Sequence, residues 1–458
     1  MGVSKILSTV LAVLFSLNIF SQQDLKWFFG YQGIGLTFDK NGGAPTIQQG
    51  ETPLEIYESI SSVSDCEGNL LFYTDGVKVM DAGHQVMTNG SGLNGPNETG
   101  NTTSGSSPNG VLIVSDPGDT SRYYIFTIGE TISGGANGWN YHVVDMALPG
   151  NGTLTNPRGE VVSKNQVIPG TGATSEFMAA TGNECGDSIW IVAHSQTGSD
   201  FWAVPLTMTG GLGSVVTSNS GIGLAGTDES RGSGDFSPDG TKLAAGFMMS
   251  GGAHVFDFDF STGSISNNIT VSGGGHYGCE FSFDGDKVYF TNFTGGTLYQ
   301  YNLLNSTLTS LAASPGAVLG DLERAPDGKI YIGRWNSNNV LSVLNTPDGV
   351  DVASAGFVEN GLNVGGLVNP GLPQMFLRDG KDLKKAKIGV PFNLNQVCDK
   401  GGSLNLNATP ACGDWTSDGV YVDNNGVFDP SGLVTPGSYN VYYSVGNCII
   451  PDTVTFLV

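Results

Sequence analysis

A strand, an Asp-Gly turn and a returning strand recur three times in the middle of the chain. The copies are GDFSPDGTKLAAGF at 234–247, CEFSFDGDKVYFTN at 279–292 and LERAPDGKIYIGRW at 322–335. Apolar residues alternate on both sides of each Asp-Gly pair, which is the signature of a tight β-hairpin. Two further alternating segments follow each hairpin before the next copy begins. Four antiparallel strands every 40 to 50 residues or so are typical of one blade of a β-propeller.

Three looser units of the same kind precede these copies, so the chain contains six predicted blades. Strands are left over at both ends: residues 26–49 supply three strands without an inner one, and residues 366–376 supply a lone strand. Together they would complete a seventh blade and remove the open edges of the ring. We therefore predict an all-β fold, a seven-bladed β-propeller closed by its N- and C-terminal strands and spanning residues 22–376.

Composition agrees with this architecture and limits the partners. Only 13% of the 458 residues are charged and 69 are glycine, which suits short strands and many turns. The net charge of −23 would repel a phosphate backbone, so we expect no nucleic-acid partner.

The first 21 residues are predicted to be a signal peptide. Lys5 precedes an apolar run over residues 6–20, and small Ser21 comes just before a polar break. The run is shorter than the ~20 apolar residues that a membrane span needs, and no later segment is apolar enough. We expect a mature chain without a membrane span, exported to the cell surface or beyond, with the export machinery as one partner.

The last part of the chain is predicted to be a second domain. Residues 377–388 form a basic linker, either a solvated connection or a docking strip for an acidic polymer, and residues 389–458 alternate like an immunoglobulin-like β-sandwich. Cys398 precedes the first strand of this domain and Cys448 precedes the last. A sandwich would bring them together, so we predict a Cys398–Cys448 disulfide.

Several motifs, taken in order, resemble the N-terminal propeller of large surface proteins of Bacteroidota. The resemblance runs from about Trp27 to Phe376. It implies export by the type IX secretion system, often in gliding species, and immunoglobulin-like modules after the propeller, but it does not supply a ligand. The motifs are WFFGYQGIGLTFD, GNLLFYTDGVKVMDAGHQVMTNGSGLNG, GVLIVSDPGDTSRYYIFTI, YHVVDMAL, FSPDGTKLA, APDGKIYIGRW and GLPQMF.

The three repeats also place an acidic residue at one recurrent position. Four residues before the aspartate of each turn stand Asp235, Glu280 and Glu323. The strand before this turn is the innermost one of its blade, so we expect these carboxylates at one height beside the axis of the ring.

Such neighbouring carboxylates raise one another's pKa unless a positive group or backbone donors compensate. Arg324, Arg231 and His276 are the nearest candidates in the sequence. Two interpretations follow. Either each carboxylate caps backbone groups of the neighbouring blade, or the set forms a ligand site with Arg324 and His276 for the hydroxyls of a sugar or for a calcium ion.

The common catalytic motifs are absent from the sequence: it has no Gly-x-Ser-x-Gly elbow, no His-Glu-x-x-His pair and no Walker loop. We therefore predict a non-enzymatic binding or adhesion protein without a catalytic residue or obligate cofactor, whose loops contact a surface glycan or a protein. Two alternatives stay open: a propeller-type glycosidase or lyase, because propeller sites are assembled from separate blades, and a ligand-free structural cap on a filamentous adhesin.

Overall fold

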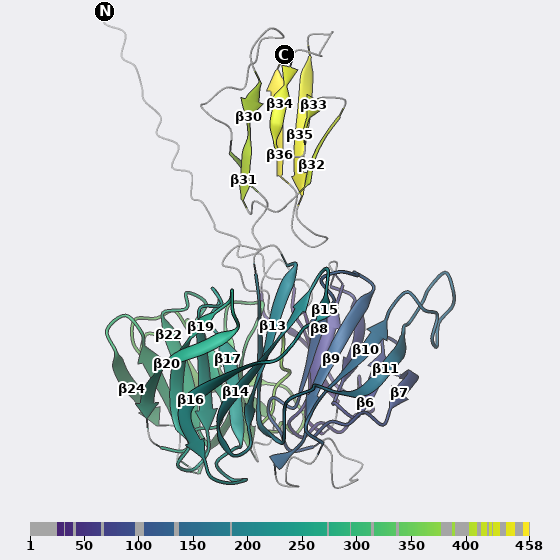
Figure 1. Cartoon of the computed structure of the whole chain (residues 1–458). Coiled ribbons are helices and arrows are strands. Elements are labelled where there is room, and N and C mark those ends of the chain that lie inside the picture. Colours follow the sequence, from purple (N-terminus) through teal and green to yellow (C-terminus); the bar gives the residue numbers. More distant parts are fainter. Residues whose placement is uncertain are drawn as a thin grey trace, which may run out of the picture.

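The computed structural model shows a ring of β-sheets followed by a small β-sandwich (Figure 1). Every regular element of the described residues is a β-strand. No helix in this part of the chain is long and apolar enough to cross a membrane. The structure describes residues 25–31, 33–39, 43–65, 68–96, 105–131, 137–183, 186–272, 274–293, 295–312, 316–335, 339–376, 387–389, 403–409, 414–418, 421–423, 425–430, 437–444 and 452–457.

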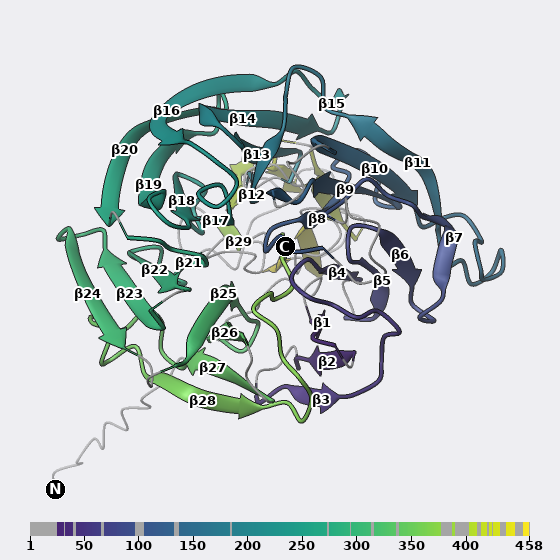
Figure 2. The same ribbon diagram turned by 90° about the horizontal axis from the view of Figure 1, so that it is seen from below.

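Six blades follow one another around the ring, and in each of them the first strand lies nearest the axis (Figure 2). Blade 1 comprises β4 (Ser61–Ser64), β5 (Leu70–Thr74), β6 (Lys78–Asp81) and β7 (Val86–Ser91). Blade 2 comprises β8 (Val111–Ser115), β9 (Arg122–Ile128), β10 (Trp139–Asp145) and β11 (Glu160–Val167). The outer strands β7 and β11 meet through one parallel pair, which joins these two blades into a single sheet.

Blade 3 is the only described blade with a fifth strand. It comprises β12 (Thr174–Gly182), β13 (Ser188–Ser195), β14 (Gly198–Thr207), β15 (Gly211–Leu212) and β16 (Val216–Leu224), and β15 and β16 both pair with β14. Blade 4 comprises β17 (Gly232–Phe236), β18 (Lys242–Phe247), β19 (Gly252–Asp259) and β20 (Ser264–Ser272).

Blades 5 and 6 complete the regular repeats. Blade 5 comprises β21 (Cys279–Phe281), β22 (Lys287–Asn292), β23 (Thr297–Asn302) and β24 (Thr307–Ala312). Blade 6 comprises β25 (Val318–Arg324), β26 (Ile330–Trp335), β27 (Val340–Leu344) and β28 (Phe357–Asn363).

The Asp-Gly turns that repeat in the sequence join the first two strands of blades 4, 5 and 6. In blade 4, Asp239 Oδ1 accepts hydrogen bonds from Ser237 Oγ at 2.6 Å and from Thr241 N at 3.1 Å. Gly240 follows with a φ of 68°, a left-handed conformation that glycine adopts without a steric penalty. The predicted hairpins are therefore confirmed together with the local chemistry that forms them.

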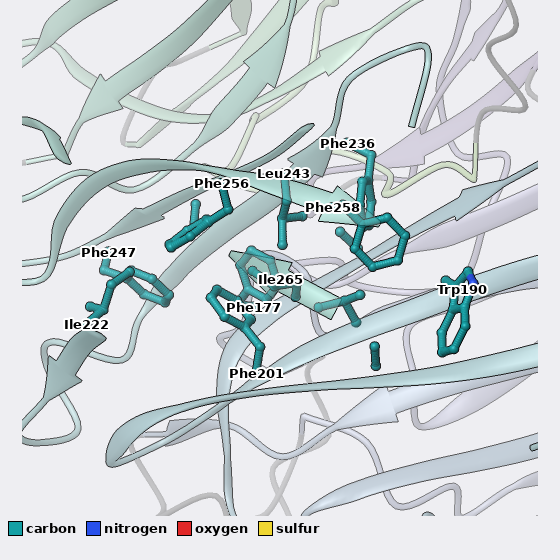
Figure 3. Close-up of a cluster of buried hydrophobic side chains, with 14 of the residues drawn as sticks. Phe177, Trp190, Phe201, Ile222, Phe236, Leu243, Phe247, Phe256, Phe258 and Ile265 are labelled. Carbon is teal, nitrogen blue, oxygen red and sulfur yellow. The ribbon is translucent and has the colours of Figure 1, made fainter. Parts of the chain in front are cut away.

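Apolar side chains from facing sheets fill the space between adjacent blades. The largest cluster lies between blades 3 and 4, where Phe177 and Phe201 make an edge-to-face contact with ring centroids 5.5 Å apart (Figure 3). Trp190 closes one side of this cluster, and its indole N–H donates to Phe260 O at 2.7 Å. Successive clusters of this kind hold the blades in a rigid ring, which fixes the inner strands around the axis.

The ring closes through blade 7, which takes strands from the start of the chain: β1 (Lys26–Phe29), β2 (Ile34–Thr37) and β3 (Thr46–Gln48). Residues 366–376 pack against it, with Val368 and Leu372 buried among its apolar side chains. This segment contains no regular strand, which differs from our prediction of an inner strand. It instead bonds to both neighbouring blades: Gln374 N donates to Ile60 O, and Asp321 N donates to Pro370 O, each at 2.8 Å.

The C-terminal residues form the predicted sandwich, and two three-stranded sheets supply most of it. Phe428 and Phe456, one from each sheet, stack with ring centroids 4.6 Å apart in the core between them. The strands are β29 (Lys387–Gly389), β30 (Leu404–Asn405), β31 (Asn407–Thr409), β32 (Asp414–Ser417), β33 (Tyr421–Val422), β34 (Val427–Asp429), β35 (Ser438–Ser444) and β36 (Asp452–Leu457). The signal peptide, most of the basic linker and the predicted Cys398–Cys448 pair lie outside the described residues.

Candidate functional site

Inner strands place side chains near the axis at both faces of the ring. We call the face at which the inner strands begin the start face, and the face at which they end the end face. Asp235 and Glu323 are the next-to-last residues of β17 and β25, toward the end face, and Glu280 is the central residue of the short strand β21.

Two of the predicted carboxylates meet one guanidinium there. Arg324 Nε lies 2.8 Å from Glu280 Oε1, and Arg324 Nη2 lies 3.3 Å from Asp235 Oδ2. Only 4% of the Arg324 side chain is exposed. Burial and the neighbouring Asp235 carboxylate raise the pKa of Glu280 well above its usual value, and the guanidinium opposes that rise.

The same carboxylates also join consecutive blades. Asp235 Oδ2 in blade 4 accepts a hydrogen bond from Phe281 N in blade 5 at 3.2 Å. Glu280 Oε2 in blade 5 accepts one from Arg324 N in blade 6 at 3.1 Å. This geometry is that of the first interpretation, in which each acidic residue caps backbone groups of the next blade.

The two remaining predicted residues are arranged differently. Glu323 is buried near Glu280 and adds to the rise of its pKa. His276 packs against the rings of Phe290 and Tyr299, and neither of its ring nitrogens has a hydrogen-bond partner in the described structure. Burial lowers its pKa to about 4, so the imidazole is neutral at pH 7 and does not compensate a carboxylate. A ligand-binding role for the five residues stays a prediction.

A second acidic cluster, which the repeats did not reveal, lies at the start face. Glu58 comes three residues before β4, and Tyr277 comes two residues before β21. The Tyr277 hydroxyl donates to Glu58 Oε1, so the contact links blade 1 to blade 5 across the ring. Glu58 is 3% exposed, and a side-chain hydrogen bond from Ser106, besides the one from Tyr277, lowers the pKa of its carboxyl group.

Two more buried carboxyl groups belong to this cluster. Glu176 on β12 accepts hydrogen bonds at Oε1 from Thr131 N at 3.2 Å and Thr131 Oγ1 at 2.7 Å. Asp321 on β25 is 3% exposed. We call Glu58, Glu176, Asp321 and Tyr277 the start-face cluster.

Burial is the largest cause of the altered acidity of this cluster. It raises the pKa of Glu58 to about 7, against the opposing effect of the Tyr277 hydrogen bond, and it raises the pKa of Asp321 to about 7 as well. The pKa of Glu176 rises well above its usual value through burial and the nearby Glu58 carboxylate. At neutral pH this cluster therefore holds protons that ordinary surface carboxylates would have released.

A chain of aromatic rings connects the start-face cluster with the surface. Tyr277 lies 4.8 Å from Phe293 between ring centroids, and Phe293 lies 5.6 Å from Trp335. Tyr57 continues the chain 5.3 Å from Trp335, and Tyr31 follows at 6.2 Å. We call these five residues the aromatic strip. Exposure increases along it, from 2% at Tyr277 to 37% at Tyr31.

Repeat-based reasoning could not find these residues, because they do not repeat. Glu58 and Tyr277 are 219 positions apart, and Glu176 and Asp321 come from blades 3 and 6. The available signal was weak: a polar residue near the start of several inner strands, as in YESISS and GHYGCEF.

The described residues contain no group of three or more His, Cys, Asp and Glu side chains arranged to hold a metal ion. Calcium binding at Asp235, Glu280 and Glu323 stays a prediction.

Comparison with known proteins gives a fold likeness only. No family model matches the chain, and no curated protein matches it. Among solved structures, the chain is similar to a periplasmic gluconolactonase from Pseudomonas aeruginosa at 12% identity and a TM-score of 0.38, over 95% of this chain and 96% of that one. A proposed 6-phosphogluconolactonase from Bacteroides uniformis gives the same identity and TM-score, over 95% and 97%.

These structures correct one of our predictions. We expected a non-enzymatic protein, but two of the similar structures are described as lactonases, so the fold does not support that exclusion. The likeness is too distant to indicate a reaction or a substrate for this chain.

Proposed function

We propose that this protein is an exported propeller that binds a carbohydrate at the start face. The observation that carries the proposal is the aromatic strip itself, which runs from the exposed Tyr31 to Tyr277 and ends at the buried Glu58 carboxyl group.

The chemistry of the strip and the cluster matches that of a sugar. A sugar ring has apolar C–H faces, which pack on flat aromatic rings, and hydroxyl groups, which need hydrogen-bond partners. Tyr57 and Trp335 are half-buried and offer ring surface, and the Glu58 carboxyl group offers an acceptor or, when protonated, a donor. A glycan is thus a better match for this site than an extended protein segment.

Export and surface location are supported by the sequence of residues 1–21 and by the family resemblance. The export machinery would then be a second partner. N-terminal sequencing of the protein recovered from culture medium or cell surface would test this part. A mature terminus near residue 22 is expected, and recovery of the uncleaved chain from the cytoplasm would contradict export.

Binding is tested with the full mature chain on a panel of polysaccharides and oligosaccharides, followed by calorimetry on those that bind. Tyr57→Ala or Trp335→Ala should weaken binding about 10- to 100-fold, because each removes a large aromatic contact. Tyr124→Ala is the matched control, since Tyr124 is a half-buried tyrosine on β9 outside the strip. Absence of binding across the panel, or equal weakening by all three variants, would contradict the proposal.

A further inference from the structure

We propose that two copies of this protein pair along β24 (Thr307–Ala312), the outer strand of blade 5, and form a weak two-fold dimer. The two β24 strands would run antiparallel, so that the four strands of blade 5 in each copy join into one sheet of eight. This inference is independent of the carbohydrate site, because it concerns the outer circumference of the ring and not its start face (Figure 2).

The first observation is that β24 is an open sheet edge. It pairs with β23 on one side, and no other strand of the described residues pairs with it. Its register with β23 is regular from Thr307 to Ala312, without a bulge. Residues 304–310 are all exposed, among them Leu304 at 76% and Leu308 at 39%. Every second residue of such an edge presents its backbone N–H and C=O groups outward, where another strand can bind them.

The other described outer strands of the ring are covered, interrupted or short. β7 pairs with β11, and β20 lies against β16, where Ile265 N donates to Ser218 Oγ at 3.0 Å. β28 carries Glu359, whose carboxylate lies 3.0 Å from Arg334 Nη2, and a bulge breaks its register with β27. β3 has only three residues. Charges, bulges and short length all keep a sheet edge from binding another strand, and β24 has none of these protections.

The lack of charge around β24 favours a second copy of the chain as the partner. The net charge of the chain is −23, so most contacts between two copies would bring like charges together. Residues 288–320, which include β23 and β24, contain no Asp, Glu, Lys or Arg. Two copies can therefore approach here without repulsion between charges at the contact. A partner recognised by its charge would find no complementary side chain on this edge.

The sequence of β24 is compatible with two-fold pairing. With the axis at Thr309, Thr309 of one copy lies opposite Thr309 of the other, and such threonine pairs stabilise neighbouring strands. The ring itself joins two blades through outer strands, since β7 and β11 make blades 1 and 2 one eight-stranded sheet. A contact of one strand per copy buries less than the roughly 1,200 Å² of a stable interface, so we expect a dissociation constant of about 0.01 to 1 mM.

Sedimentation velocity of the full mature chain from about 1 μM to 1 mM tests the proposal. We expect a monomer at the lowest concentration and a growing dimer fraction above it, without larger species, because pairing uses up the open edge. Thr309→Lys should abolish the dimer, since it sets two positive charges opposite each other. Val358→Lys is the matched control: Val358 is 45% exposed on the outer strand β28, and this variant should dimerise as the wild type does.

An equimolar mixture of Thr309→Lys and Thr309→Glu gives the second test. Each variant alone should stay monomeric with the melting temperature of the wild type, because Thr309 is exposed. Their mixture should dimerise, since opposite charges then face each other across the axis. A monomeric mixture overturns the pairing about Thr309. A wild-type monomer at every concentration, a series of larger species, or equal loss of the dimer in Thr309→Lys and Val358→Lys overturns the proposal as a whole.

Discussion

The two faces of the ring hold acidic side chains from different blades, and they differ in the groups that pair with those side chains. At the end face, the Arg324 guanidinium lies between Glu280 and Asp235, and both carboxylates accept backbone hydrogen bonds from the next blade. At the start face, Glu58 and Glu176 accept hydrogen bonds from Tyr277 and Thr131, and the charge of Arg231 opposes the rise of both pKa values. The pKa of Glu280 is raised as well, so the faces differ in their pairing: a guanidinium and backbone donors at the end face, hydroxyl donors at the start face.

Among the substitutions that test this difference between the faces, Arg324→Met should have the largest effect on stability. It leaves the buried Glu280 and the half-buried Asp235 without their cation, and loss of a partner from a buried ion pair typically costs about 3 to 5 kcal/mol of unfolding free energy. Losing the guanidinium raises the folded-state pKa of Glu280 further, so the penalty is present above that pKa and shrinks as the pH falls. Urea unfolding at pH 7 and pH 4 measures both effects.

Arg122→Met is the matched control for that variant. The Arg122 side chain is 48% exposed and pairs with Asp119 and Asp145 at 3.5 and 3.7 Å. Its loss should cost about 1 kcal/mol or less. If Arg324→Met cost no more than this control, the end-face network would not be structural, and the comparison between the faces would fail.

The second prediction concerns the pH dependence of stability that Glu58 contributes at the start face. The pKa of Glu58 is raised from 4.5 to about 7 in the folded state, so the folded protein binds the proton more tightly than the unfolded chain. Stability should therefore fall as the pH rises from about 4.5 to 7, by about 3 kcal/mol for this group. Glu58→Gln should remove this part of the slope, as measured by thermal unfolding across that pH range. A slope identical to the wild type would show that Glu58 does not hold a raised pKa.

The ring itself was predictable, because the information that specifies it is local and repeated. Each copy of the hairpin carries its own turn chemistry, such as Ser237, Asp239 and Gly240 in blade 4. Alternation in the flanking strands then sets which side chains face the neighbouring blade. Residues 366–376, the closing segment, were correctly predicted to lie against blade 7, but their backbone is not the strand that we predicted. Its hydrogen bonds run to Ile60 and Asp321 in other blades, and no local pattern encodes those contacts.

The end-face network was half predictable for the same reason. Asp235 and Glu280 repeat with the hairpin, and Arg324 was among the candidate partners, so their approach follows from the alignment of the blades. His276 packs against Phe290 and Tyr299 from other strands of blade 5, and its role at a ligand site stays a prediction. The start-face cluster arises only when the ring closes and single residues from four different blades converge.

The third prediction tests whether the closing segment, residues 366–376, holds Glu58 in place at the start face. A Cβ added at Gly371 would overlap backbone atoms of Glu58, so Gly371→Ala must displace one of the two segments. We expect a loss of about 1 to 3 kcal/mol, as for overpacked interiors, together with weaker carbohydrate binding. Gly223→Ala is the control, since a Cβ there meets nothing within 4 Å. Urea unfolding and calorimetry on both variants give the comparison, and normal binding by a folded Gly371→Ala protein would show that Glu58 need not be held in place.

The smallest effect is expected at His276, which precedes Tyr277 at the start face but belongs to neither carboxylate group. Its imidazole is buried with both nitrogens unpartnered among the described residues, so His276→Leu removes a desolvated polar group in exchange for some lost packing. The net change at pH 7 should stay within about 1 kcal/mol. Burial lowers the histidine pKa to about 4, so the unfolded chain takes up the proton more readily as the pH falls below 6.5. The variant should therefore lose less stability between pH 6.5 and 4 than the wild type does.

His142→Leu supplies the contrast for that measurement, because its ring bonds to Thr127 Oγ1 and Asn165 N, both at 3.0 Å. Leaving those two groups unpaired should cost about 1 to 3 kcal/mol. Carbohydrate binding should survive His276→Leu, since the ring contacts of Tyr277 with Phe293 and its hydrogen bond to Glu58 do not involve the imidazole. Loss of binding in a stable His276→Leu protein would indicate that the binding site lies at His276 rather than at the aromatic strip. It would also mean that a neutral, unpartnered imidazole, rather than a proton-bound carboxyl group, marks the functional face of this ring.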